Sequence, residues 1–305
     1  MAMARGSYRY SLVHGWAKLP KGVSLGYTHG VATDSQHNVF VFNQSEHAVI
    51  QFSPEGHFLR SWGKQFAAGA HGMTLTREGN EEFLWLTDYA LHRVAKYTTY
   101  GEEVLRLPTP PLQEVYPSDD LYLPTGVAVS PQGDVYVCDG YGQHYVHRYT
   151  SQGEWVQSWG GQGAEPGRMN CPHGVWVDTR RNEARLLVAD RANVRIQIYD
   201  LDGSLLDTVT ENLRYPCGFA QDGEALIIPD LHGRVTILDG DNRLITHLGD
   251  NPGVWERPDY PNIAHSDRQP GVFISPHAAC VDARGDLYVV EWVSDGRISK
   301  FRRVE

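Results

Sequence analysis

Hydrophobic and polar residues alternate along most of the chain, in short runs separated by Gly, Asn, Asp or Pro. Residues 71–107 hold four consecutive runs of this kind, which read HGMTLT, EFLWLTD, LHRVAKYT and GEEVLRL. Alternation with period two and enrichment in β-branched and aromatic residues predict β-strands. No segment keeps helical periodicity over three turns, so the pattern predicts an all-β protein.

One short segment returns six times. The copies begin at His29, His71, Thr125, His173, Cys217 and His277. Successive copies are separated by 42, 54, 48, 44 and 60 residues. Each copy is followed by a second run that ends in a polar residue, at Asn43, Asp88, Asp139, Asp190, Asp230 and Glu291. Four short strands per repeat of this length are typical of a β-propeller. We therefore predict a six-bladed β-propeller in which residues 1–305 form a single domain.

The two ends of the chain are predicted to share the last blade. The sixth repeat has only three strand-like runs, and the N-terminal run YRYSLV at residues 8–13 is left over. Pairing of this run with the sixth blade would close the propeller and remove exposed strand edges. Two Pro-rich connections, 109–124 and 250–275, come directly before a first strand. They are expected to lie over the mouth of the central channel, where loops carry function.

Composition narrows the possible partners. The net charge is −10, which argues against nucleic acid as a partner because phosphate binding needs a basic surface. No stretch approaches the roughly 18 apolar residues of a membrane span, and no signal-peptide pattern is present. The four cysteines form no CxxC pair, which favours reduced thiols. We expect a cytoplasmic protein with a small-molecule substrate and no membrane partner.

Histidines at the repeat starts are the strongest chemical signal. In a six-fold ring, repeats two, four and six are about 120° apart, and they carry His71, His173 and His277. One such histidine would most simply bind neighbouring backbone, but three converging imidazoles predict a His₃ site for a divalent metal, with zinc favoured. His29 has the same position in repeat one and is a candidate substrate contact, a candidate hydrogen-bond donor to one of the ligands, or a candidate fourth ligand. Cys217 is expected to be a small buried hydrophobic residue.

The ends of the second strands supply further candidates. A tyrosine and an arginine are expected near the metal, in the segments Asp139-Gly140-Tyr141 and Asp190-Arg191. The tyrosine suits proton transfer, and the arginine suits stabilisation of an anion. The aspartates themselves are expected to satisfy backbone donors in turns. We expect three histidines outside the repeat starts to have structural and not catalytic roles, namely His47, His92 and His147.

At these residues the chain resembles the NHL-repeat propellers of the peptidyl-α-hydroxyglycine α-amidating lyase type. The segments that carry the resemblance are HGMTL…LWLTDYALHRVAKY, PTGVAVSPQGDVYVCDGYG, EPGRMNCPHGVWV…LLVADRANVRIQIYD and SPHAACVDARGDLYVVEW. The resemblance implies zinc ligation by His71, His173 and His277. It also implies a catalytic role for Tyr141 and an active-site role for Arg191.

The chain departs from this family at three positions. Gln44 stands where the family has an arginine, which affects a substrate contact. Ala278 replaces an aspartate of a structural calcium site, so that calcium is not supported. Gly142 replaces a cysteine, so the family's disulfide at this position is absent. The chain therefore keeps the residues that the family uses for metal binding and proton transfer, and it lacks one residue that the family uses to bind the substrate.

The sequence favours a metal-dependent, amidating-lyase-like lyase that acts on a small polar substrate bearing a hydroxyl or carbonyl group. Tyr141 and Arg191 would be its catalytic residues, and Gln44 and His29 would contact the substrate. A metal-dependent hydrolase such as a lactonase is the alternative enzyme, although such propellers usually bind calcium through carboxylate and Asn ligands. A non-catalytic binding scaffold is the third possibility, against which the three channel histidines weigh.

Overall fold

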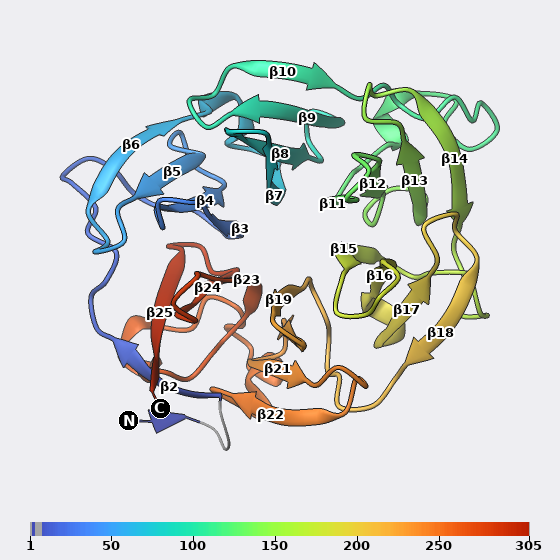
Figure 1. The fold of residues 1–305 in the computed structure, drawn as a ribbon. Coiled ribbons are helices and arrows are strands. Elements are labelled where there is room, and N and C mark those ends of the chain that lie inside the picture. Colours follow the sequence, from blue (N-terminus) through green and yellow to red (C-terminus); the bar gives the residue numbers. More distant parts are fainter. Residues whose placement is uncertain (1, 4–7, 305) are drawn as a thin grey trace. The chain divides into compact units, whose positions relative to one another are not determined.

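A computed structural model describes residues 2–3 and 8–304, and they form six antiparallel sheets that follow one another along the chain (Figure 1). The fold is a six-bladed β-propeller. Contacts divide the chain into two compact units, the first made of Met1–Ala67 with Asn212–Glu305 and the second of Ala68–Glu211. The prediction of a single domain stays a prediction.

The first unit holds three sheets. Their strands are β3 (Thr28–Thr33), β4 (Val39–Asn43), β5 (Val49–Phe52) and β6 (Phe58–Trp62); β19 (Ala220–Asp222), β20 (Ala225–Asp230), β21 (Arg234–Leu238) and β22 (Leu244–Leu248); and β23 (Pro276–Val281), β24 (Leu287–Glu291), β25 (Arg297–Val304), β2 (Arg9–Val13) and β1 (Ala2–Met3). The last sheet has the order β1-β2-β25-β24-β23, with Arg9 opposite Val304. This pairing confirms that the N-terminal run completes the sixth blade.

The second unit holds the other three sheets. Their strands are β7 (Ala70–Glu78), β8 (Glu81–Asp88), β9 (Arg93–Thr98) and β10 (Glu103–Arg106); β11 (Gly126–Val129), β12 (Val135–Cys138), β13 (Tyr145–Tyr149) and β14 (Trp155–Gly160); and β15 (Pro172–Asp178), β16 (Arg185–Asp190), β17 (Arg195–Tyr199) and β18 (Leu205–Val209). Each sheet is a meander of neighbouring strands, as the alternation predicts.

The core lies between successive sheets within each unit. In the first unit Val41 and Phe52 pack with Tyr288 and Val290 of the last sheet. In the second unit a corresponding cluster joins the sheets of β11–β14 and β15–β18 through buried side chains that include Tyr136, Val146, Val188 and Tyr199. Both faces of the middle strands are therefore buried, which explains why runs such as VFVFN are apolar almost throughout.

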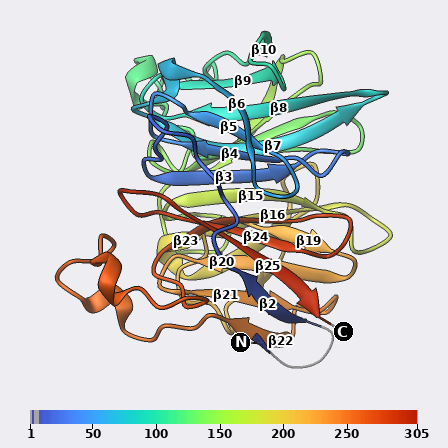
Figure 2. The same cartoon turned by 90° about the vertical axis from the view of Figure 1, so that its left-hand side faces the viewer.

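In the part of the chain that the structure describes, the connections contain short 3₁₀ helices, namely η1 (Lys64–Phe66), η2 (Asp119–Leu121), η3 (Arg191–Asn193), η4 (Val254–Glu256) and η5 (His265–Asp267). Figure 2 shows the segment with η4 and η5 projecting beyond the strand ends of its own unit. Tyr260 ties this segment down, because its hydroxyl donates to the Leu231 carbonyl at 2.9 Å. Among the described residues no helix is long and apolar enough to cross a bilayer.

Candidate metal and active site

The four histidines at the repeat starts lie on strands that are irregular at that point. On β7, Ala70 pairs with Asp88 and Met73 with Leu86, so three steps along β7 match two along β8. Similar register shifts occur at the starts of β3, β15 and β23. A bulge of this kind adds one residue and redirects the side chain at that place. The four bulges therefore hold His29, His71, His173 and His277 in one common register position.

In the second unit, His71 and His173 converge with Tyr141. The two Nε2 atoms are 3.2 Å apart, and the Tyr141 hydroxyl lies 3.1 Å from Nε2 of His71 and 3.3 Å from Nε2 of His173. The histidines are 1% and 2% exposed, whereas Tyr141 is 37% exposed. The structure thus brings together three residues that the sequence nominated from separate repeats.

A backbone carbonyl fixes the orientation of His71. Its Nδ1 donates to the carbonyl of Thr125 at 2.6 Å, so in the neutral form of the ring Nε2 would carry the lone pair. Gly72 permits this approach, because a Cβ there would lie only 2.6 Å from the same carbonyl oxygen. A hydrogen bond from the second ring nitrogen to a carbonyl is the usual support of a metal-binding histidine.

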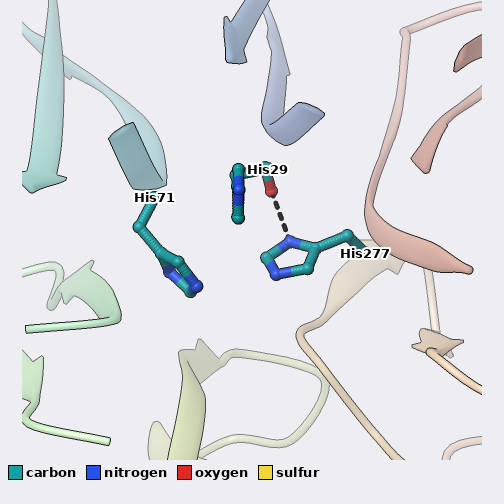
Figure 3. Close-up of side chains that lie close together, drawn as sticks. All are labelled: His29, His71 and His277. Atoms are coloured by element: carbon teal, nitrogen blue, oxygen red, sulfur yellow. Dashed lines mark hydrogen bonds between the residues drawn. The ribbon is translucent and has the colours of Figure 1, made fainter. Parts of the chain in front are cut away.

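His277 is oriented in the same way in the first unit. Its Nδ1 donates to the carbonyl of His29 at 2.8 Å (Figure 3), and the two rings meet edge to face with centroids 4.5 Å apart. His29 and Thr125 are repeat-equivalent residues, so both histidines bind the first-strand carbonyl of the following repeat. Among the described residues at the repeat starts, buried side chains with donor atoms suited to a metal ion are those of His29, His71, His173, Cys217 and His277.

Arg191 lies against the tyrosine of the second unit. Its guanidinium carbon is 5.5 Å from the centre of the Tyr141 ring, and its Nη2 donates to Sγ of Cys171 at 3.3 Å. Burial raises the pKa of the Cys171 thiol, and the Arg191 charge opposes this rise. Cys171 has a left-handed φ of 59° and was not singled out by the sequence. Its place directly before the PHG motif was the available signal.

Gln44 belongs to the first unit and follows β4. Its backbone N–H donates to the Tyr27 carbonyl at 2.9 Å, and its carbonyl lies so close to Gly26 that a Cβ there would clash. The backbone at Gln44 is therefore well fixed.

The aspartates that end the second strands hold turns together, as expected. Asp88 accepts from the Leu91 N–H at 2.8 Å, and Asp230 accepts from the Arg214 and Tyr215 N–H groups at 3.0 Å. Burial raises the pKa of Asp88 to about 6, against the lowering effect of its backbone donors. These carboxylates therefore act as anchors for neighbouring loops.

The turn that carries Tyr141 is anchored by a buried network. Asp139 accepts from Leu123 N at 2.7 Å, from Gln143 N and from the Tyr116 hydroxyl at 2.6 Å. His147 lies 2.9 Å from the same hydroxyl through Nε2 and 2.7 Å from Ser158 Oγ through Nδ1. Burial lowers the pKa of His147 to about 3, so the ring is neutral and its Nε2–H can donate to Tyr116.

Sequence analysis missed Tyr116, which lies in the Pro-rich connection 109–124. The structural roles expected for the other histidines agree with their contacts. His47 Nδ1 is 2.8 Å from Ser61 Oγ, and His92 Nδ1 donates to the Tyr122 carbonyl at 2.9 Å. The same connection and the Tyr141 turn border a cavity of about 440 Å³ lined by residues that include Glu114, Gln143 and His144.

Comparisons with known proteins agree with this architecture. The NHL repeat family model matches residues 121–149. The human NHL repeat-containing protein 3 is 31% identical over 245 residues, which are 73% of this chain and 67% of that protein. The chain belongs to the NHL-repeat family. This confirms the family resemblance inferred from the repeats.

Relatives of this NHL-repeat protein include amidating lyases. Peptidyl-alpha-hydroxyglycine alpha-amidating lyase 1 of Drosophila melanogaster is 32% identical over 167 residues, 50% of this chain and 29% of that protein. A solved streptogramin B lyase matches with a TM-score of 0.65 at 13% identity, covering 96% of this chain and 97% of that one. At this identity the structural match shows the fold alone.

Proposed function

We propose that this NHL-repeat protein is a metal-dependent lyase of the amidating-lyase type that acts on a small polar substrate bearing a hydroxyl or carbonyl group. The observation that carries the proposal is the meeting of His71, His173 and Tyr141 within 3.1–3.3 Å of one another. Two buried imidazoles with a partly exposed phenol provide metal donors and a proton-transfer group at one place.

The proposed ligands are His71, His173 and His277. All three lie on bulged first strands, and His71 and His277 each donate Nδ1–H to the carbonyl of the following repeat. His277 is assigned from this shared register and from the family resemblance. Neutral imidazoles favour zinc, whereas calcium takes oxygen ligands. The donor set therefore fits zinc and does not fit the calcium of a lactonase-like site.

When bound, such a metal would polarise a substrate oxygen as a Lewis acid. Tyr141 would move the proton of that oxygen, because its hydroxyl contacts both imidazoles and the residue is 37% exposed. Arg191, held by Cys171 beside the Tyr141 ring, would bind an anionic group of the substrate. Gln44 and His29 are proposed as further substrate contacts.

Metal analysis of protein purified without a histidine tag tests this proposal most directly. Stoichiometric zinc supports the lyase, stoichiometric calcium would favour the lactonase-like hydrolase, and absence of metal would favour a binding scaffold. Activity is then sought with metal-loaded protein on α-hydroxyglycine derivatives, hydroxy acids and lactones.

The ligand assignment is tested by His173→Ala. The variant should lose most of its bound metal and nearly all activity, because it leaves the ligand set incomplete. His92→Gln is the matched control, because His92 lies in the same unit and its ring donates a hydrogen bond to the backbone carbonyl of Tyr122. Full metal occupancy in His173→Ala would remove His173 from the site.

A further inference from the structure

The polar cavity of about 440 Å³ in the second unit is separate from the histidine–tyrosine cluster, whose side chains do not line it. Its walls come from three connections of that unit. Glu114 belongs to the Pro-rich connection before β11, Gln143 and His144 to the turn after β12, and Arg168 to the segment between β14 and β15. A cavity of this volume can hold a small molecule.

The cavity presents one acidic and one basic side chain that do not pair. Glu114 and Arg168 both line it, yet neither forms an ion pair with the other or with another residue in the described part of the chain. Exposed charges often stand alone on protein surfaces, so this observation gains weight only from the neighbouring groups. Those groups are donors that converge on the same space.

The backbone at Gly161 leaves room for a ligand beside the guanidinium of Arg168. A Cβ at Gly161 would lie 2.6 Å from Nη1 of Arg168 and 3.1 Å from the hydroxyl oxygen of Tyr145. The space that a side chain would fill there is therefore bordered by two hydrogen-bond donors. Arg168 Nη1 also donates to the Gly160 carbonyl at 2.8 Å, which holds the guanidinium in place. A fixed guanidinium beside a hydroxyl suits a carboxylate.

The turn after β12 adds a donor that is already oriented. Nδ1 of His144 accepts from the Cys171 N–H at 3.1 Å, so in the neutral ring the hydrogen is on Nε2. Next to it, the backbone N–H of Gln143 donates to the Asp139 carboxylate, which fixes the turn. Donors that are held in place before a ligand arrives lower the entropic cost of binding.

We propose that this cavity binds a small zwitterion, such as an amino acid or a short peptide. The carboxylate of the ligand contacts Arg168 and the Tyr145 hydroxyl, and its ammonium group contacts Glu114. His144 donates to the polar groups between the two charges. This binding uses no metal, so it is a function beyond the proposed lyase activity and does not depend on it.

Calorimetric titration of the parent protein tests the site without an activity assay. Alanine, alanylalanine and trialanine place the ammonium and the carboxylate at increasing separation, and at least one of them should bind. The N-acetylated form of that ligand lacks the ammonium and its amide lacks the carboxylate. Each blocked form should bind about three- to tenfold more weakly than the zwitterion. Binding of the zwitterion should persist in EDTA.

Two variants assign the two ends of the ligand. Glu114→Gln should weaken binding of the zwitterion by a similar factor and leave the N-acetylated form unchanged. Arg168→Gln should weaken the zwitterion and leave the amide unchanged. Arg77→Gln is the matched control, because Arg77 is an exposed arginine of the same unit that donates to the Gly79 carbonyl.

The results also separate this inference from the proposed function. Failure of all three ligands to bind the parent at millimolar concentration would overturn the zwitterion site, and so would equal binding of free and blocked forms. Loss of binding in EDTA would place the ligand on a metal and would also overturn it. None of these results changes the metal content on which the lyase proposal depends. The blocked ligands decide with the parent alone, even if a variant folds poorly.

Discussion

Replacing Tyr116 by Phe should destabilise the protein by about 2–4 kcal/mol. The tyrosine hydroxyl donates to the buried Asp139 carboxylate at 2.6 Å and lies 2.9 Å from Nε2 of His147. A hydrogen bond to a charged group contributes about 1.5–3 kcal/mol, and a buried donor left without a partner costs about 1–3 kcal/mol. The two contributions overlap, because the remaining donors of Asp139 relax toward it.

Urea denaturation followed by tryptophan fluorescence measures this loss as a lower midpoint with an unchanged slope. Tyr199→Phe is the control, since Tyr199 is 1% exposed and its hydroxyl has no hydrogen-bond partner among the described residues. We expect the control to stay within about 0.5 kcal/mol of the parent. If Tyr116→Phe also stayed within that range, the network would not be a stabilising element, and the anchoring of the Tyr141 turn would need another explanation.

Three further predictions follow from the same structure. Gly72→Ala should cost about 1–3 kcal/mol in denaturation and weaken metal binding through His71, whereas Gly218→Ala, whose Cβ would lie 3.8 Å from the nearest atom, should be nearly neutral. His147 has a folded-state pKa of about 3 against 6.5 ordinarily, so its contribution is complete above pH 6.5 and is lost as the pH falls toward 3. Between pH 7 and pH 5 the parent should therefore lose about 2 kcal/mol more than His147→Gln; equal losses would show that the ring is not held neutral. Gln44→Arg should raise turnover of an acyl-α-hydroxyglycine roughly 10–100-fold, as a charged contact to an anion would, and efficient turnover by the parent without this gain would make the departure neutral.

Strand positions and sheet order could be predicted from the sequence, because alternation and repeat spacing directly encode which residues face the core. VFVFN, LWLTD and RLLVAD all became the second strands of their sheets. The left-over run at residues 8–13 was also placed correctly, since a three-stranded last blade leaves one edge to cover.

The details that orient the candidate site could not be predicted in the same way. A bulge at His71 or His173 leaves no mark in the alternation, because one extra residue at a strand start looks like part of the turn. Tyr116 lies in a Pro-rich connection, where no periodic pattern fixes which side chain turns inward. Its partners, Asp139 and His147, were each recognised separately, but the network depends on how that connection folds.

The pairing of β2 with β25 has a consequence for biosynthesis. The strand β2 is synthesised long before its partner β25, because most of the described residues lie between Arg9 and Val304. The second unit, in contrast, is one uninterrupted stretch from Ala68 to Glu211. During translation this stretch can complete its three sheets before β25 is made. Until then β2 lacks the partner strand that it has in the last sheet. Until β25 has been synthesised, the edge of β2 that it covers is open to pairing with the wrong strand.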